Sequence, residues 1–250
     1  MGFLKKLLFG TEVSEEEQKR RMGNVQQKQE EKPVSQMNED EILEYFRKIR
    51  DLEDIPERIS GKIKLAEAGY QGMFGSIADD YFELSKQTGE KPQWEEIKKW
   101  SEKAADAGDP DGHMKLGMYY VNQMPPQVEN CAREYFLSME GGWEPAAFAL
   151  QELWNRKLEA SSGYSAEELS GMLRKTIANG IEPEMQRLSG SGSEEEYAAY
   201  GFMYYFGIYF PQDYGKAREY FTKGKNEYNS IIAGEILERL NLDDEDEEDV

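Results

Sequence analysis

The residue types that perform most enzyme chemistry are scarce in this chain. His113 is its one histidine and Cys131 its one cysteine among 250 residues. One residue of each type cannot build a conventional zinc site, and no serine or cysteine nucleophile motif accompanies the histidine. We therefore expect no catalytic residue, no metal ligand and no cofactor-binding residue. His113 is interpreted as a helix-face residue, and Cys131 as a small hydrophobe that packs in a core.

Two short segments resemble ion-binding loops but lack the residues that such loops need. Gly190-Ser191-Gly192 precedes a predicted helix, where backbone amides can hold an anion, but glutamates follow it where a phosphate loop has lysine. Residues 106–112 are rich in aspartate. Alignment on Gly112 nevertheless puts Ala107 and Met118 at calcium-loop positions that require acids. We expect a capped loop at the first segment and a helix junction at the second.

The net charge argues against one class of partner. The chain has 50 acidic and 30 basic residues, which gives a net charge of −20. Such a chain repels the phosphates of nucleic acids and of anionic lipids, so we expect no nucleic-acid binding. No apolar run approaches the roughly 18 residues of a membrane span. A single cysteine fits a reducing compartment, and we predict a cytoplasmic protein.

Three segments place a glycine, an acid and a proline in the same order: Gly108-Asp109-Pro110, Gly142-Trp143-Glu144-Pro145 and Gly180-Ile181-Glu182-Pro183. Glycine just past a helix end permits left-handed backbone, and proline suits the first turn of the next helix. Each segment is interpreted as a junction between two helices. The spacing of the three prolines is typical of a helical-repeat array.

Apolar residues recur at helical spacing through most of the chain, and no stretch alternates as a half-buried strand does. Helices are predicted at about 38–52, from there to 69, and at 73–87, 94–107, 110–122, 129–140, 145–158, 165–179, 194–208, 214–226 and 229–240. We predict an all-α fold in which antiparallel helix pairs stack into a right-handed α-α solenoid.

Composition divides the chain into three parts. Residues 1–37 contain a short amphipathic stretch followed by a polar linker. Residues 38–242 contain the predicted helical-repeat solenoid. Residues 243–250 are almost all acidic and repel one another, so they are predicted to form a disordered tail.

One unit has the features of a known repeat. Tyr200-Gly201-Phe202-Met203-Tyr204-Tyr205-Phe206-Gly207 precedes a turn aspartate and the helix Ala217-Arg218-Glu219-Tyr220-Phe221, and Leu116-Gly117-Met118-Tyr119-Tyr120 repeats the first pattern. These segments resemble the SEL-like repeat, a relative of the tetratricopeptide repeat, over about residues 55–240. Gln123 and Val128 depart from that pattern, replacing its glycine and its turn aspartate. The resemblance implies stacked helix pairs that serve as a protein–protein interaction scaffold or adaptor, with no catalytic site common to the family.

Adjacent aromatic residues provide the candidate binding positions. Neighbours on a helix point about 100° apart, so both members of a tyrosine pair cannot face one core. We expect one member of each pair to line the concave surface, where aromatic side chains make good anchors. The candidate partner-binding residues are Tyr119, Tyr120, Trp154, Tyr204 and Tyr205.

Three functional hypotheses follow. The leading one is a non-catalytic scaffold or adaptor that binds a protein or peptide on the solenoid surface. The second is an acidic inhibitor or immunity-type protein that covers a basic enzyme, which the net charge suggests. The third is a peripheral membrane scaffold whose residues 1–10 make weak contact with a bilayer through Phe3, Leu4, Leu7 and Leu8. The alternative is a frayed segment that packs on the solenoid or has no role. The identity of the partner and the oligomeric state stay open.

Overall fold

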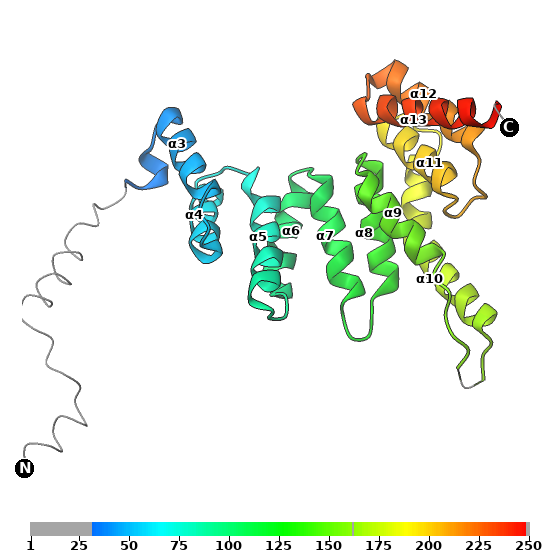
Figure 1. The fold of residues 1–250 in the computed structure, drawn as a ribbon, viewed down its shortest axis with the longest axis horizontal. Coiled ribbons are helices and arrows are strands. Elements are labelled where there is room, and N and C mark those ends of the chain that lie inside the picture. The colour runs from blue at the N-terminus through cyan, green and yellow to red at the C-terminus, as the bar shows by residue number, and fades with distance from the viewer. Residues whose placement is uncertain (1–31, 162, 249–250) are drawn as a thin grey trace, which may run out of the picture. The chain divides into compact units, whose positions relative to one another are not determined.

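The described part of the computed structural model covers residues 32–161 and 163–248. Within these ranges the chain forms eleven α-helices and one 3₁₀-helix, and the pairing of Ser161 with Tyr164 is an isolated bridge. The predicted all-α class is confirmed. In chain order the elements are η1 (Val34–Gln36), α3 (Glu39–Arg50), α4 (Ile55–Glu67), α5 (Met73–Thr88), α6 (Trp94–Asp106), α7 (Pro110–Val121), α8 (Val128–Glu140), α9 (Glu144–Trp154), α10 (Ala166–Leu188), α11 (Glu194–Phe206), α12 (Tyr214–Tyr228) and α13 (Ile231–Glu248) (Figure 1).

The chain divides into two units, residues 1–48 and 49–250. In the first unit, Asn38 and Glu41 cap the start of α3 reciprocally. The Glu41 amide donates to Asn38 Oδ1 over 2.9 Å, and the Asn38 amide donates to Glu41 Oε2 over 2.8 Å. These bonds satisfy two amides that the helix itself leaves free. The amphipathic stretch with Phe3, Leu4, Leu7 and Leu8 lies outside the described residues.

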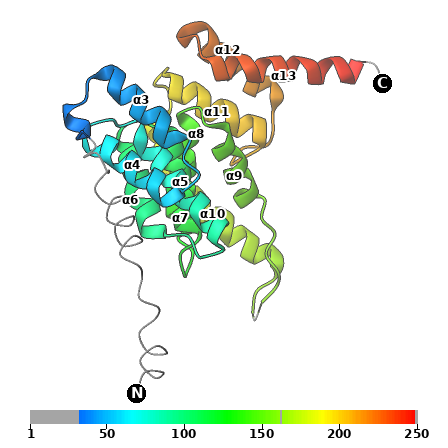
Figure 2. The ribbon, with the colours of Figure 1, turned by 60° about the vertical axis from the view of Figure 1, so that its left-hand side comes forward.

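In the second unit, helices that follow one another in the chain pack together from α4 to α9 and from α11 to α13. The exception is α10, which packs chiefly on α8 and makes few contacts with its neighbour α9. As a result α8 is surrounded by α7, α9, α10 and α11. The first half of α10 and the loop before it extend away from these helices in both views (Figures 1 and 2). The largest hydrophobic core runs from α8 to α13.

The closest helix pairs meet where a glycine faces an aromatic ring. A Cβ at Gly117 of α7 would overlap the ring of Tyr135 of α8. A Cβ at Gly201 of α11 would lie 2.7 Å from the ring of Phe221 of α12. The same contact thus occurs in two helix pairs. In both, the glycine has no side chain, so the ring on the partner helix can occupy that space. Both rings are buried.

Ion pairs with at least one buried member join the helices nearer the start of the second unit. Asp80 of α5 pairs with Lys62 of α4 over 2.6 Å and with Arg58 of α4 over 3.0 Å. Lys115 of α7 pairs with Asp79 of α5 over 3.0 Å. Lys62, Asp80 and Lys115 are all buried. Loss of Asp80 would leave the buried Lys62 without its ion-pair partner, so the pairs of Asp80 restrict how α4 and α5 can pack. Asp79 is exposed and Lys115 also pairs with Asp111 of its own helix, so the pair between α5 and α7 imposes a weaker restriction.

Two of the three glycine–acid–proline segments are helix junctions, as predicted. Gly108 and Gly142 have left-handed backbone, with φ of 84° and 83°. Asp109 caps α7, where its Oδ1 accepts the amide of Asp111 over 3.0 Å. Pro110 and Pro145 lie in the first turns of α7 and α9.

The prediction for the third segment is wrong. α10 runs without interruption from Ala166 to Leu188, with Pro183 inside it. Gly180 allows α10 to approach α8 closely and does not mark a helix end. A Cβ at this position would overlap the carbonyl oxygen of Glu129 on α8. The other buried residues of α10 lie in this same half of the helix: Ile177, Ile181, Glu184, Met185 and Leu188. Burying one large apolar side chain contributes about 1.5–3 kcal/mol, so the packing outweighs the roughly 3 kcal/mol cost of an interior proline.

Two other boundaries differ from the prediction. α9 ends at Trp154, before the predicted end at 158. α13 continues to Glu248, so residues 243–248 extend a helix where a disordered tail was predicted. The side chains of Ile236 and Leu240 are buried, which fixes the earlier turns of α13. The helix can then extend, because each residue added to an existing helix gains one backbone hydrogen bond. Throughout residues 32–161 and 163–248, no helix is both long enough and apolar enough to cross a membrane.

We predict that Gly117→Ala destabilises the protein by about 2 kcal/mol, because the added methyl group must displace the Tyr135 ring and overpacking costs about 1–3 kcal/mol. Gly171→Ala in the exposed half of α10 is the matched control. Its Cβ meets nothing within 4 Å, so alanine should stabilise that helix by up to about 1 kcal/mol. Urea unfolding followed by circular dichroism measures both changes. Equal effects of the two substitutions would show that the close contact is unimportant.

Candidate functional site

The two residues best suited to chemistry take structural roles in the helices. His113 of α7 lies with Nδ1 2.7 Å from Oε2 of Glu134 on α8, which links the two helices. Cys131 is fully buried beside Tyr135. Burial raises the pKa of its thiol to about 12, so the thiol is protonated near neutral pH and is a poor nucleophile. Among the described residues, no cluster of three or more His, Cys, Asp and Glu side chains could hold a metal ion.

The glycine-rich loop before α11 already holds an anion that belongs to the chain. Glu196 is buried, and its carboxylate accepts the amide of Gly190 over 2.8 Å and the amide of Gly192 over 2.6 Å. Ser193 caps α11 by accepting the Glu196 amide over 3.2 Å. A phosphate would therefore have to displace this carboxylate. The segment is a capped loop, as predicted.

The five predicted binding residues lie in three separate aromatic groups. Tyr119 and Tyr120 belong to a group on α5, α6 and α7 with Phe82 and Trp94. Tyr119 is buried and donates to Oε1 of Glu95 over 3.3 Å, whereas Tyr120 is half-buried. Tyr119 thus serves helix packing.

The other three predicted residues lie farther along the chain. Tyr205 contacts Phe206 and Tyr214. Trp154 and Tyr204 are joined through two intervening rings, those of Tyr209 and Phe210. The structure therefore brings only this last pair into one group.

That group is the largest partly exposed aromatic cluster of the second unit, and we name it the aromatic surface. It consists of Trp154 at the end of α9, Tyr200 and Tyr204 on α11, Tyr209 and Phe210 in the following loop, and Tyr220 on α12. All six side chains are half-buried. Rings that are partly exposed and already held by their neighbours can bind a partner with little further loss of conformational entropy.

Four of these rings form a nearly parallel set. Tyr204 stacks on Phe210 with 4.9 Å between ring centroids and on Tyr220 with 5.9 Å. Tyr200 stacks on the same two rings at 6.2 and 5.4 Å. The interplanar angles lie between 15° and 24°. Trp154 joins the set through Tyr209, whose ring centroid is 6.1 Å away.

Cations lie over the faces of several of these rings. Lys216 Nζ is 4.8 Å from the ring centroid of Tyr204, and Lys223 Nζ is 5.6 Å from that of Tyr220. The Arg174 guanidinium lies 5.9 Å from the ring centroid of Trp154. Basic side chains therefore lie over the aromatic surface, together with acidic ones such as Glu182, which accepts the Tyr209 hydroxyl.

Tyr209 reaches the aromatic surface at a cost in backbone energy. Its φ is 65°, in the left-handed region that a tyrosine seldom adopts. The side chain is held by a hydrogen bond of 2.9 Å from Oη to Oε1 of Glu182 and by the ring of Trp154. The bond to Glu182 raises the pKa of Tyr209, with burial adding to the effect. Such strained residues persist where the surroundings hold them, and they cluster at functional sites.

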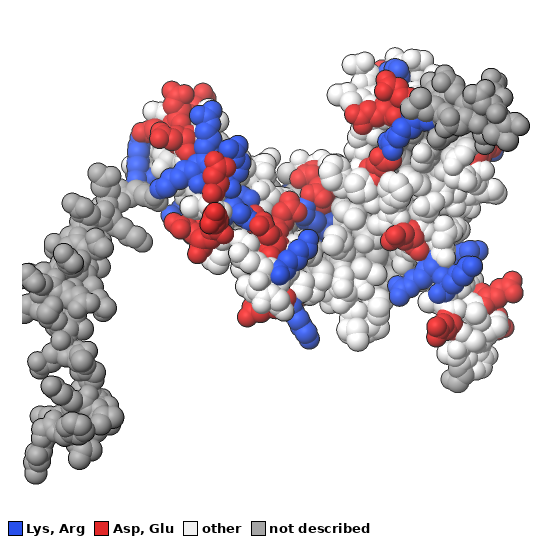
Figure 3. Space-filling view, in the orientation of Figure 1, with Lys and Arg blue, Asp and Glu red and all other residues white. Residues whose placement is uncertain are grey.

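The distribution of charge also differs between the helices of the second unit. On the face seen in Figure 3, acidic and basic side chains mix over α5 and α6, whereas most of the surface over α7, α8 and α9 is uncharged. Phe148 of α9 is 50% exposed and lies against Phe206 of α11. Depletion of charge is a compositional mark of protein interfaces.

Four members of the aromatic surface, Tyr200, Tyr209, Phe210 and Tyr220, are not among the binding residues predicted from the sequence. Tyr220 stands beside Phe221, so the reasoning applied to Tyr204 and Tyr205 would also have placed one of these two rings outward. Phe221 is buried, and Tyr220 is the outward ring. Phe210 lies in a loop, where helical spacing gives no signal.

Comparison of the chain with protein-family models, with curated proteins and with solved structures finds no match. The candidate site must therefore be judged by its own geometry.

We predict that the stability of the protein falls as the pH rises from 9 towards 12. The buried thiol of Cys131 ionises near pH 12 when folded and near pH 9 when unfolded, so alkali favours the unfolded state. At about pH 10.5 this group should remove about 2 kcal/mol of unfolding free energy. Urea unfolding at about pH 8 and 10.5 measures the loss. Cys131→Ala should reduce the difference between the two pH values, and an unchanged difference would refute the assignment.

Proposed function

We propose that this chain is a non-catalytic protein–protein interaction scaffold that binds a protein or peptide segment on its aromatic surface. The observation that carries the proposal is the set of six half-buried rings that spans α9, α11, the following loop and α12. Tyrosine and tryptophan are enriched among the residues that dominate binding energy at interfaces. The strained backbone of Tyr209 and the uncharged surface over α7 to α9 support the same function.

The proposed architecture is a right-handed α-α solenoid of SEL-like repeats. Its support is the recurrence of one contact, glycine against ring, at Gly117 with Tyr135 and at Gly201 with Phe221. The successive packing of α4 to α8 fits a stacked array, while the place of α10 on α8 is a departure from it. We further propose that the protein is cytoplasmic, as the single cysteine suggests, and that it is not an enzyme; the protonated thiol of Cys131 supports the latter.

A peptide-display selection on the immobilised full chain tests the function. Peptides that bind should lose at least about tenfold in affinity, or 1.4 kcal/mol, when Tyr204 and Tyr220 are both replaced by alanine. Tyr70→Ala is the matched control, because Tyr70 is 40% exposed and lies between α4 and α5, outside the aromatic surface. Isothermal titration gives the affinities, and circular dichroism establishes that each variant is folded. The proposal fails if no peptide is selected, or if Tyr70→Ala weakens binding as much as the double substitution.

A second substitution separates binding from stability. Tyr209→Gly removes a ring from the aromatic surface but also removes the left-handed strain, which is worth about 1–2 kcal/mol. The gain offsets the lost contacts with Trp154 and Glu182, so the unfolding free energy should change by less than about 1 kcal/mol. Affinity for the selected peptides should nevertheless fall about tenfold. Unchanged affinity would remove Tyr209 from the binding site.

A further inference from the structure

A cavity lies on α8, α11, α12 and α13, with a volume of about 180 Å³. A single water occupies about 30 Å³ of liquid, so this cavity can admit a side chain. Its walls include the apolar side chains of Ala198, Phe221, Ile232 and Ala233. Gly224 of α12 also lines the cavity.

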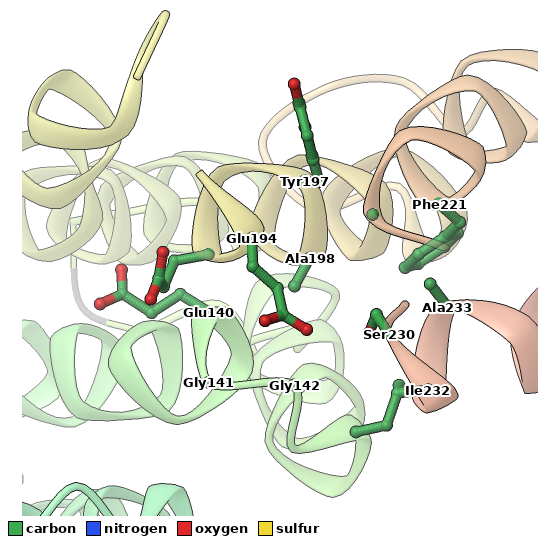
Figure 4. A pocket seen from close by; sticks show the side chains of 12 residues that line it. Glu140, Gly141, Gly142, Glu194, Tyr197, Ala198, Phe221, Ser230, Ile232 and Ala233 are labelled. Atoms are coloured by element: carbon green, nitrogen blue, oxygen red, sulfur yellow. The ribbon is translucent and has the colours of Figure 1, made fainter. Parts of the chain in front are cut away.

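Three carboxylates lie at this cavity: Glu140 at the end of α8, and Glu194 and Glu195 in the first turn of α11. In Figure 4 the carboxylate of Glu194 points into the space between α11 and the Gly141–Gly142 turn, while the ring of Tyr197 points the other way. Glu140 is already paired, since it accepts Nη2 of Arg187 over 2.6 Å. Neither Glu194 nor Glu195 forms an ion pair within residues 32–161 and 163–248.

The electrostatic potential at the cavity is negative even when the partial charges of the helix dipoles are included. The start of α11 contributes about half a positive charge, and the end of α8 about half a negative one, so these two nearly cancel. The charges of Glu194 and Glu195 remain. Burial raises the pKa of Glu140, and the nearby carboxylates of Glu184 and Glu195 also raise it, while Arg187 acts against them. Negative charge is therefore concentrated on one side of a cavity with apolar walls.

We propose that this cavity binds one arginine side chain of a partner protein, with its guanidinium at Glu194 and Glu195 and its methylene stem against Phe221 and Ala233. This inference rests on the proposed function, because it takes the bound partner to be a protein. Arginine fits both parts of the cavity. Its stem covers apolar surface, and its planar head forms paired hydrogen bonds with carboxylates.

The test uses Nα-acetyl-arginine methylamide as the probe and the uncharged citrulline analogue as its control. Methyl resonances of Ala198, Ile232 and Ala233 in the full-length protein report occupancy of the cavity. We expect saturable shifts with the arginine probe and none with citrulline. The apparent Kd should increase about fivefold or more when Glu194 and Glu195 are both changed to glutamine. Changing the exposed Glu235 and Glu238 to glutamine should leave it unchanged.

A third variant guards against loss of binding through unfolding. A Cβ at Gly224 would lie 3.6 Å from Ala233 Cβ and from Tyr197 Cβ, an ordinary contact. Gly224→Ala should therefore raise the melting temperature, since alanine favours a helix, yet weaken the probe by filling part of the cavity. The proposal is overturned if no saturable shift occurs below about 50 mM probe, if citrulline binds equally, or if the glutamate substitutions have no effect. Such a failure leaves the peptide selection and its dependence on Tyr204 unaffected, so the two proposals are tested separately.

Discussion

The close approach of paired helices at a glycine is the constraint on which the rest of the second unit depends. At Gly201 the absence of a side chain gives the Phe221 ring its place between α11 and α12. With Phe221 directed inward, the preceding residue on the helix, Tyr220, is directed towards Tyr200 and Tyr204. The aromatic surface is therefore a by-product of core packing, because the ring that fills the interior determines which ring remains outside.

The two ends of the second unit are stabilised in different ways. α4 and α5 are joined by buried ion pairs at Asp80, and α5 and α7 by the pair of buried Lys115 with exposed Asp79, whereas rings contribute much of the contact between α11 and α12. A buried ion pair requires a matched partner and leaves little freedom at the surface. Aromatic packing has no such requirement, since a ring can contact a neighbour on one face and a binding partner on the other. This difference explains why the candidate site lies at the aromatic end.

Local signals in the sequence were sufficient for most of the fold and for part of the site. Gly108 and Gly142 could be assigned as helix ends because the left-handed backbone is a local requirement. Gly180 belongs to the same glycine–acid–proline pattern, but a glycine is needed there because α10 closely approaches α8. That contact involves residues some 50 positions away in the chain, so no local signal predicts it. The reasoning about adjacent aromatic residues holds for Tyr119 and Tyr120 but does not hold for Tyr135 and Phe136, which are both buried. α8 is packed on several sides, so it has no single outward face.

The contacts between glycine and ring also have a consequence for inheritance. Neither Gly117 nor Tyr135 can change alone without a loss of packing, because a side chain at one position needs the space of the ring at the other. We expect the two positions to covary, and the same holds for Gly201 and Phe221. In distant relatives whose surface residues have all changed, these positions should still be substituted in pairs. Such paired substitutions could therefore be used to recognise a distant relative.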